Sequence, residues 1–408
     1  MRLYRNLVFA SVDALNEIFN EEKQADKVLK GTLKRDKRWG ARDRGFIAET
    51  VYDIVRWKRL YAEIADVKAP YSRQDLFRIF AVWATLRGIE IPADWKQFEP
   101  IPTRRIKGKF DELSKIRKFR ESIPDWLDEL GEKALGKQWD KELAALNQQA
   151  PVVLRANALR TTPKDLRNNL ADLEIDTTLV DGHPDAVQLV ERKNVFTTPI
   201  FKEGHFEVQD ASSQKVAHFL DVKPGMRVVD TCAGAGGKTL HLAALMENKG
   251  QIIALDIYEG KLKELKRRAK RARAHNIEPR VIDSTKVFKK LYGTADRVLI
   301  DAPCSGLGTI KRSPDIKWKL EESFLEKVMR RQAQLLESYS KILKPGGKMV
   351  YATCSILPRE NQEQVRNFLA TPEGADFTLV KDEKVSPAKS GYDGFYMALL
   401  EKKKEEKK

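Results

Sequence analysis

Two cysteines, Cys304 and Cys354, each follow an apolar, β-branched run that is typical of a buried β-strand. Cys304 lies in the segment Asp-Ala-Pro-Cys-Ser-Gly, and Cys354 lies in Tyr-Ala-Thr-Cys-Ser. In α/β proteins, ligands bind where such strands end. A thiolate is both a good nucleophile and a usable leaving group, so it suits a reaction with a transient carbon–sulfur bond. The pair therefore suggests addition to C6 of a cytosine, the step that activates C5 to accept a methyl group.

Asp301, three residues before Cys304, adds an acid to this pair. An acid that binds or protonates N3 of a cytosine assists the addition of sulfur. In the usual order of a methyltransferase sheet, the strands ending at Asp301 and Tyr351 are neighbours, roughly 5 Å apart, so both thiols can reach one flipped base. A lone cysteine is more often core filler than a nucleophile, and we assign that role to Cys232. The residues alone leave open which of the other two thiols attacks.

A glycine-rich turn lies between Asp230 and Thr239, after a strand and before a helix. Its spacing fits neither a P-loop nor the strict dinucleotide fingerprint, but its glycines let the backbone approach a ligand at a helix N-terminus. The next two strands end in Asp256 and Asp283. We expect Asp256 to bind ribose hydroxyls and Asp283 to reach an adenine amino group, although each alone is equally well explained as a cap. Together these features favour S-adenosylmethionine, which fits better than NAD because the chain also carries methyl-acceptor chemistry.

The composition indicates the partner, the cell compartment and the state of the cysteines that we expect. The formal charge of +16 over 408 residues predicts a polyanionic partner, with nucleic acid the usual one. No window approaches the ~18 uninterrupted apolar residues of a membrane helix, and no signal peptide is evident, so we expect a cytoplasmic protein. The three cysteines lack a short Cys-x-x-Cys motif, so we expect reduced thiols, no disulfide framework and no metal.

The pattern of the chain changes twice, which predicts three domains and a tail. Helical spacing marks residues 1–122 as an all-helical domain that ends in a basic linker. This linker is a candidate RNA-facing segment, and a solvated charge run explains it equally well. Residues 123–205 read as a small α/β module. Alternating strands and helices over residues 206–400 predict a doubly wound, mostly parallel sheet, and hence an α/β fold. Residues 401–408 have no apolar side chain to bury, so we expect disorder there.

These motifs resemble the Sun (Fmu) family of RNA cytosine-5 methyltransferases, and the resemblance covers nearly the whole chain. Besides the two cysteine segments and the glycine turn, it rests on residues 208–214, 308–318, 344–347, 358–361 and 393–396. The resemblance implies a class I, Rossmann-like methyltransferase domain, and it implies that the helical domain and the module at residues 123–205 bind RNA. One departure is Gly234-Ala235, which stands where many members have Ala-Pro and should alter loop stiffness more than chemistry.

The resemblance also assigns roles that spacing alone does not. It implies that Cys354 is the nucleophile and that Cys304 helps to release the product. It places Lys238 near the reacting groups. It puts S-adenosylmethionine against Cys232, Ala233, Gly234, Ala235, Gly236, Gly237, Lys238, Asp256, Asp283 and Asp301.

The front half is similar to the bacterial RsmB branch of this family, whose first domain is NusB-like. Residues 42–44, 55–57 and 122–127 carry this weaker likeness. It implies small-subunit (16S) ribosomal RNA as substrate and a monomer in solution. Two alternatives stay open: a non-catalytic ribosome-assembly factor, and a C5 methyltransferase acting on tRNA or another RNA. Methylation of an exocyclic amine normally uses Asp/Asn-Pro-Pro-aromatic, and the segment ending in Cys304 departs from that motif.

Overall fold

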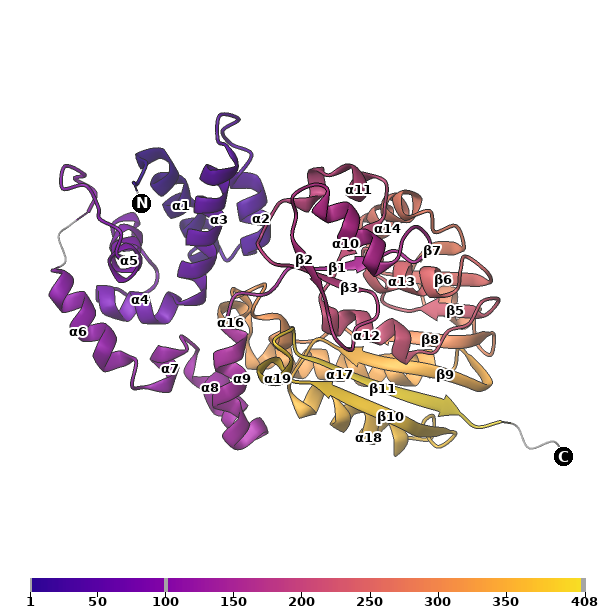
Figure 1. Ribbon diagram of the computed structural model, residues 1–408. Helices are drawn as coiled ribbons and strands as arrows, with labels where there is room; N and C mark the ends of the chain where they lie inside the picture. The colour runs from indigo at the N-terminus through magenta and orange to yellow at the C-terminus, as the bar shows by residue number, and fades with distance from the viewer. Residues whose placement is uncertain (1, 99–101, 405–408) are drawn as a thin grey trace. The chain divides into compact units, whose positions relative to one another are not determined.

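The computed structural model describes residues 2–98 and 102–404 (Figure 1). The chain divides into two compact units. One unit contains residues 1–148 together with residues 310–320, and the other contains residues 149–309 and 321–408.

The first unit is helical, as the sequence predicts. Apolar residues at three- and four-residue spacing, such as Val8, Val12 and Leu15, are completely buried in its core. The described helices of this unit are α1 (Arg5–Phe19), α2 (Ala25–Thr32), α3 (Ala41–Arg56), α4 (Lys58–Ala65), α5 (Arg73–Leu86), α6 (Thr103–Leu113), α7 (Arg117–Arg120), α8 (Asp125–Leu135), the 3-10 helix η1 (Gly136–Gln138), α9 (Trp139–Leu146) and α16 (Ile316–Lys319).

The predicted basic linker is largely helical, because it forms α6 and α7. Part of its charge is paired: Arg117 lies 2.8 Å from Asp128, and Arg120 bonds Asp140 at 2.5 Å. Helices α8 and α9 group with the helical unit, although we placed them in the small module that begins at residue 123. They are held there partly by Asn147, whose amide donates to the backbone oxygen of Glu121 at 2.8 Å.

Residues 310–320 belong to the helical unit, whereas the sequence pattern assigned them to the methyltransferase domain. The fully buried Lys317 fixes this segment. Its Nζ donates to the backbone oxygens of Arg56 at 2.8 Å and Glu121 at 3.2 Å, and to Oδ1 of Asn147 at 3.0 Å. An ammonium has three donors, so these three acceptors satisfy it. Sequence reasoning missed this insertion because its partners are far away along the chain.

The second unit contains a small antiparallel sheet of order β2-β3-β1-β4. Its elements are β1 (Val153–Ala156), α10 (Pro163–Ala171), β2 (Thr177–Leu179), β3 (Ala186–Leu189), η2 (Val195–Thr197), α11 (Pro199–Lys202) and β4 (Phe206–Val208). Leu154 pairs with Val208. The sheet therefore continues past residue 205, where we expected the module to end.

The larger sheet has the order β10-β11-β9-β8-β5-β6-β7 (Figure 1). Its parallel strands are β5 (Arg227–Asp230), β6 (Gln251–Asp256), β7 (Ile277–Val281), β8 (Ala295–Asp301) and β9 (Leu343–Thr353), and β10 (Phe377–Val385) and β11 (Phe395–Lys402) are antiparallel. The reversal of strand order between β5 and β8 makes the sheet doubly wound. The predicted α/β class is confirmed.

Helices cover both faces of this sheet because alternate strand residues point to opposite sides. Val228 packs with α12 (Ala211–Phe219), α13 (Gly237–Leu245) and α14 (Glu259–Ala272), whereas Val229 packs on the other side. That other side is covered by α15 (Lys286–Lys289), α17 (Glu322–Ser340) and α18 (Gln362–Leu369). The 3-10 helices η3 (Leu307–Thr309) and η4 (Pro358–Glu360), and α19 (Pro387–Ser390), complete the unit.

Strand β11 enters the segment that we expected to be a disordered tail. Glu401 pairs with Lys348 of β9, and Lys402 pairs with Phe377 of β10. A strand between two neighbours gains backbone hydrogen bonds without apolar side chains, so composition alone misjudged these residues. Residues 405–408 of the predicted tail lie outside the described residues.

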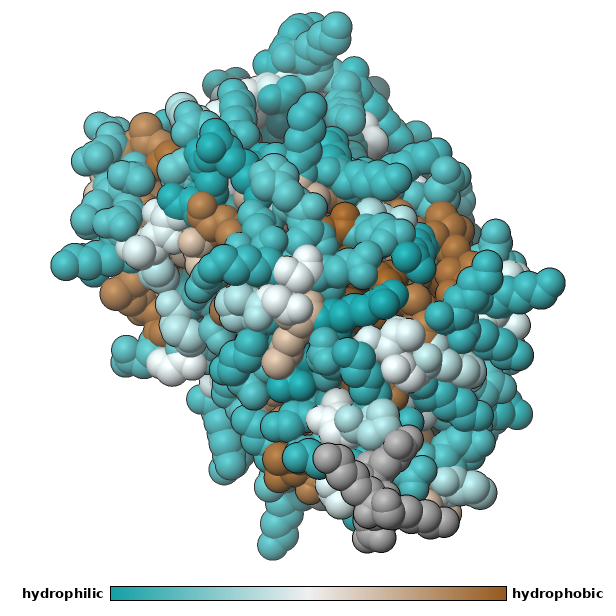
Figure 2. Space-filling view, turned by 90° about the vertical axis from the view of Figure 1, so that its right-hand side faces the viewer, coloured by the Kyte–Doolittle hydropathy of each residue, from teal (hydrophilic) through white to brown (hydrophobic). Residues whose placement is uncertain are grey.

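None of the described helices is long and apolar enough to span a membrane. The face of the second unit in Figure 2 is mostly hydrophilic, with small, separate hydrophobic areas.

Candidate active site

The two thiols that the sequence singles out lie side by side. Strands β8 and β9 are parallel neighbours, and Asp301 is in register with Ala352. The segments that follow them carry Cys304 and Cys354, whose sulfur atoms are 2.9 Å apart. Both cysteines are free and partly exposed. The adjacency that we predicted from strand order is therefore present.

The two thiols are not equivalent. The hydrogen bond to Cys354 and burial raise the pKa of the Cys304 thiol well above its usual range. The raised pKa keeps Cys304 protonated. The ammonium of Lys238 interacts electrostatically with Cys354.

Lys238 and Asp301 form an ion pair beside the thiols. Their Nζ and Oδ2 atoms are 2.7 Å apart, and only 11% of the Lys238 side chain is exposed. Burial lowers the pKa of Lys238, but the charge and hydrogen bond of Asp301 outweigh it, so the net shift is upward. The ammonium also lies 5.1 Å from the ring centre of Phe395. Lys238 is thus a fixed positive charge between the glycine turn and the two cysteine segments.

A buried carboxylate, Glu360, ties the two cysteine segments together. It accepts from the backbone N–H of Ser305 at 2.7 Å and from the Ser305 hydroxyl at 2.5 Å, and it also accepts from the Ser355 hydroxyl. Gln332 of α17 donates to it at 3.1 Å. Glu360 has no exposed surface. Because Ser305 follows Cys304 and Ser355 follows Cys354, this one side chain links the residues next to the two thiols.

Sequence reasoning gave Glu360 no role beyond its place in the family-like run 358–361. The available signal was the acidic residue itself within that run, next to Asn361. Asn361 supports the same segment, since its Nδ2 donates to the backbone oxygen of Ser355 at 2.9 Å.

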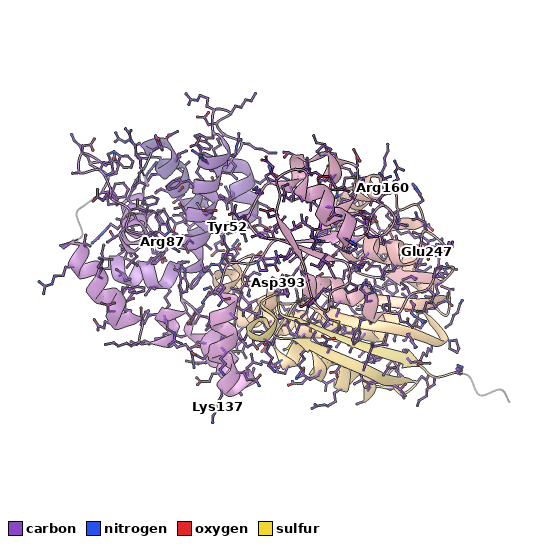
Figure 3. The ribbon with its side chains drawn as sticks, in the orientation of Figure 1. Tyr52, Arg87, Lys137, Arg160, Glu247 and Asp393 are labelled. Carbon is purple, nitrogen blue, oxygen red and sulfur yellow. The ribbon has the colours of Figure 1, made fainter. Side chains whose placement is uncertain are left out.

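Two glycines hold the segment after Cys304 against its neighbours. The N–H of Gly308 donates to the backbone oxygen of Cys354 at 2.9 Å, and the N–H of Gly394 donates to that of Gly308 at 2.8 Å. A Cβ at Gly308 would collide with Gly394 and Cys354, so only glycine fits. Asp393, labelled in Figure 3, precedes Gly394 on the chain that enters β11.

The glycine turn has the geometry of a ligand cradle. Gly236 ends it with φ of 87°, immediately before α13, and an added Cβ would lie 2.7 Å from the side chain of Leu265. The N–H of Gly234 donates to Oδ2 of Asp256 at 2.8 Å, and the N–H of Tyr258 donates to Oδ1 at 2.8 Å. Asp256 is thereby fixed beside the turn, and each of its oxygens keeps a lone pair for another donor.

The remaining predicted site residues differ in their surroundings. Burial raises the pKa of Cys232 well above its usual range, and this thiol packs beside the core, which agrees with a filler role. Asp283 is exposed on the turn after β7. Ala233 and Ala235 lie in the turn itself, and Gly237 is the first residue of α13. The backbone oxygen of Ala235 accepts a hydrogen bond from Arg268 at 2.8 Å. Exposed Ile257 offers an apolar surface directly after Asp256.

Asp230, the last residue of β5, holds the glycine turn through a hydrogen bond with α13. The hydroxyl of Thr239 donates to its Oδ2 at 2.7 Å. Burial raises the pKa of Asp230 to about 7, although the hydrogen bond from Thr239 opposes the shift. This carboxyl therefore links the end of β5 to the first turn of α13.

The chain is similar to proteins of one family. A model described as 16S rRNA methyltransferase RsmB/F matches residues 217–401, and one described as the ferredoxin-like domain of RsmF/B-like methyltransferases matches residues 123–196. The probable ribosomal RNA small subunit methyltransferase B of Synechocystis is 35% identical over 88% of this chain and 91% of that relative. Ribosomal RNA small subunit methyltransferase B of Vibrio vulnificus is 36% identical over 68% of this chain and 66% of that relative.

Solved structures show the same likeness. The crystal structure of PH0851 matches with a TM-score of 0.83 and 28% identity, over 98% of this chain and 100% of that one. A methyltransferase homolog protein from Pyrococcus horikoshii matches with a TM-score of 0.63 and 27% identity, over 70% of this chain and 97% of that one.

Proposed function

Because the chain belongs to the RsmB/F family of S-adenosylmethionine-dependent RNA cytosine-5 methyltransferases, we propose that it methylates C5 of a cytosine in 16S rRNA through a covalent bond between Cys354 and C6. The observation that carries the covalent step is the pair of sulfurs 2.9 Å apart at the ends of neighbouring strands. The substrate rests on the relatives, which are named for small-subunit ribosomal RNA.

The glycine turn suits S-adenosylmethionine. Its open backbone at Gly234, the fixed carboxylate of Asp256 and the exposed side chain of Ile257 match the methionine, ribose and adenine parts of that molecule. When bound, the cofactor supplies a methyl group on a positively charged sulfur. The acidic side chains of Asp256 and Asp301 suit its charge and its hydroxyls. Asp283 stays our predicted partner for the adenine.

In the first step the Cys354 thiolate attacks C6 of the flipped cytosine. A carbon–sulfur bond forms, and the electron pair of the C5–C6 double bond moves toward N3 and C5. The proton that leaves the Cys354 thiol reaches N3 through the Asp301 carboxyl group, so the negative charge that moves toward N3 is neutralised and C6 becomes more electrophilic. C5, now nucleophilic, takes the methyl group. Lys238 holds Asp301 in place through their 2.7 Å contact.

Cys304 completes the reaction after its environment changes. Its pKa is raised first of all by the hydrogen bond to Cys354. Once Cys354 is a thioether, that charge-assisted hydrogen bond is lost, and the pKa of Cys304 falls back. Cys304 then gives up its own proton to water, and its thiolate takes the proton from C5 while the C6–sulfur bond breaks and the electron pair of that bond returns to Cys354. The double bond is restored and the thiolate is regenerated.

The positive charge of the protein supports an RNA substrate. The net charge is +16, and Lys263, Lys266 and Lys270 are exposed along the outer side of α14. Such residues neutralise phosphates without reading sequence. Binding should therefore weaken as salt increases.

The test is transfer of a labelled methyl group from S-adenosylmethionine to purified 16S rRNA by the full chain. After digestion to nucleosides, we expect the label in 5-methylcytidine, and bisulfite sequencing then locates the target. The absence of transfer to any RNA would refute the proposal. If the label appeared in tRNA but never in 16S rRNA, the proposed substrate would be wrong, whereas the proposed methylation of C5 would stand.

A further inference from the structure

Three side chains away from the thiols converge on one point in the second unit. Asp185 lies on the turn before β3, His218 lies on α12, and His241 lies on α13. The Nε2 atoms of His218 and His241 are 2.5 Å and 2.8 Å from the same carboxylate oxygen, Oδ2 of Asp185. One ligand atom from each residue lies within 4.8 Å of the other two. Two imidazoles and one carboxylate are a known ligand set for zinc.

We propose that Asp185, His218 and His241 bind one Zn²⁺ ion. Bonds of about 2.0–2.2 Å place the ligand atoms of a tetrahedral zinc site ~3.3 Å apart, so the two imidazoles need to move away from Asp185 by less than ~1 Å. Asp185 and His218 also line a cavity of about 280 Å³. The fourth position of the metal can therefore hold a water molecule on that side.

The surroundings select the type of cation. Arg155 is buried close enough to act electrostatically on Asp185 and His241, and Lys215 and Lys381 line the same cavity. Mg²⁺ and Ca²⁺ rely on several oxygen ligands, usually including carboxylates, which this positively charged corner lacks. Imidazole nitrogens bind Zn²⁺ strongly enough to offset such charges.

A metal here would connect parts of the second unit that are far apart in the sequence. Asp185 belongs to the small sheet, whereas α12 and α13 cover the larger one. His241 also lies three residues after Lys238, on the helix that begins at the glycine turn. Bound zinc should thus stabilise the unit and restrain the turn. We expected no metal because we considered only the spacing of the cysteines, and this cluster contains no cysteine.

The experiment uses the full chain, stripped with a chelator and then titrated with Zn²⁺ alone in competition with a chelating dye. His218→Gln is the main variant, since His218 is on the surface and its loss should not prevent folding. Asp185→Asn is the second. His183→Gln is the matched control, because His183 lines the same cavity but is not in the cluster. The Co²⁺ form reports the ligand type by its spectrum.

We expect one Zn²⁺ per chain in the natural protein and in His183→Gln, with binding at least ~100-fold weaker in the other two variants. The melting temperature should rise with Zn²⁺ only where binding is retained. The Co²⁺ form should lack a sulfur-to-metal charge-transfer band. The proposal is overturned if the natural protein binds no Zn²⁺, if His218→Gln and Asp185→Asn bind as tightly as the control, or if the charge-transfer band shows cysteine ligands.

Discussion

Replacing Glu360 with Gln tests whether one buried carboxylate sets the geometry of the reaction. Glu360 accepts four hydrogen bonds, two from Ser305, one from Ser355 and one from Gln332. The amide of Gln has one oxygen, so about two of these donors lose their acceptor. Each unsatisfied buried donor costs ~1–3 kcal/mol, but the serine hydroxyls can turn and accept from the new amide.

We therefore expect Glu360→Gln to destabilise the two cysteine segments by about 2–3 kcal/mol. If this cost falls on the transition state, it corresponds to a ~100-fold slower reaction, because about 1.4 kcal/mol changes a rate tenfold. A small displacement of reacting groups has an effect of similar size. The KM for RNA should change little, since Glu360 has no exposed surface with which to bind it.

The assay is single-turnover methyl transfer at saturating RNA and S-adenosylmethionine, with circular dichroism as the check on folding. Glu363→Gln is the matched control, because it removes the same charge three residues away on α18. A folded Glu360→Gln protein that reacts within about threefold of the natural rate would refute the reasoning. Loss of RNA affinity with an unchanged rate constant would refute it equally.

Three further predictions concern stability. Because the pKa of Asp230 is raised to about 7, its protonated form contributes fully to the unfolding free energy below pH ~4. This contribution falls by up to about 4 kcal/mol as the pH rises through 7. Asp230→Asn should abolish this decline in denaturant titrations across that range. Lys317→Met should lower the unfolding free energy of the helical unit by about 3 kcal/mol or more, because three buried acceptors lose their donor; an unchanged denaturation midpoint would contradict this. Gly236→Ala should lower the melting temperature more than Gly234→Ala, since both have positive φ but only the first Cβ meets Leu265; equal losses would show that the contact is unimportant.

The parts of the site that the sequence predicts are those encoded locally. Cys304 and Cys354 follow strand-forming runs, and Asp301 ends one of them, so the order of a parallel sheet is enough to bring them together. The same holds for the glycine turn beside Asp256, because consecutive parallel strands end at one edge. Lys238 came only from the family resemblance.

The parts that sequence reasoning missed depend on contacts between distant residues. Nothing near Glu360 in the sequence indicates that it bonds both Ser305 and Ser355, since this depends on where two loops meet. The burial of Lys317 in the helical unit is a second case, because its three acceptors belong to residues that are distant in the sequence. The role of Asp283 stays a prediction, because the structure leaves it exposed on its turn.

The central claim is that sulfur bonds the cytosine ring before the methyl group moves, and that Cys354 is that sulfur. It is tested most directly by incubating Cys354→Ala and Cys304→Ala proteins with 16S rRNA and S-adenosylmethionine and running both on denaturing gels. Our account predicts a stable protein–RNA adduct with Cys304→Ala, which cannot release its product, and none with Cys354→Ala. The reverse pattern would exchange the two roles, and full turnover by a protein lacking both thiols would contradict the covalent mechanism.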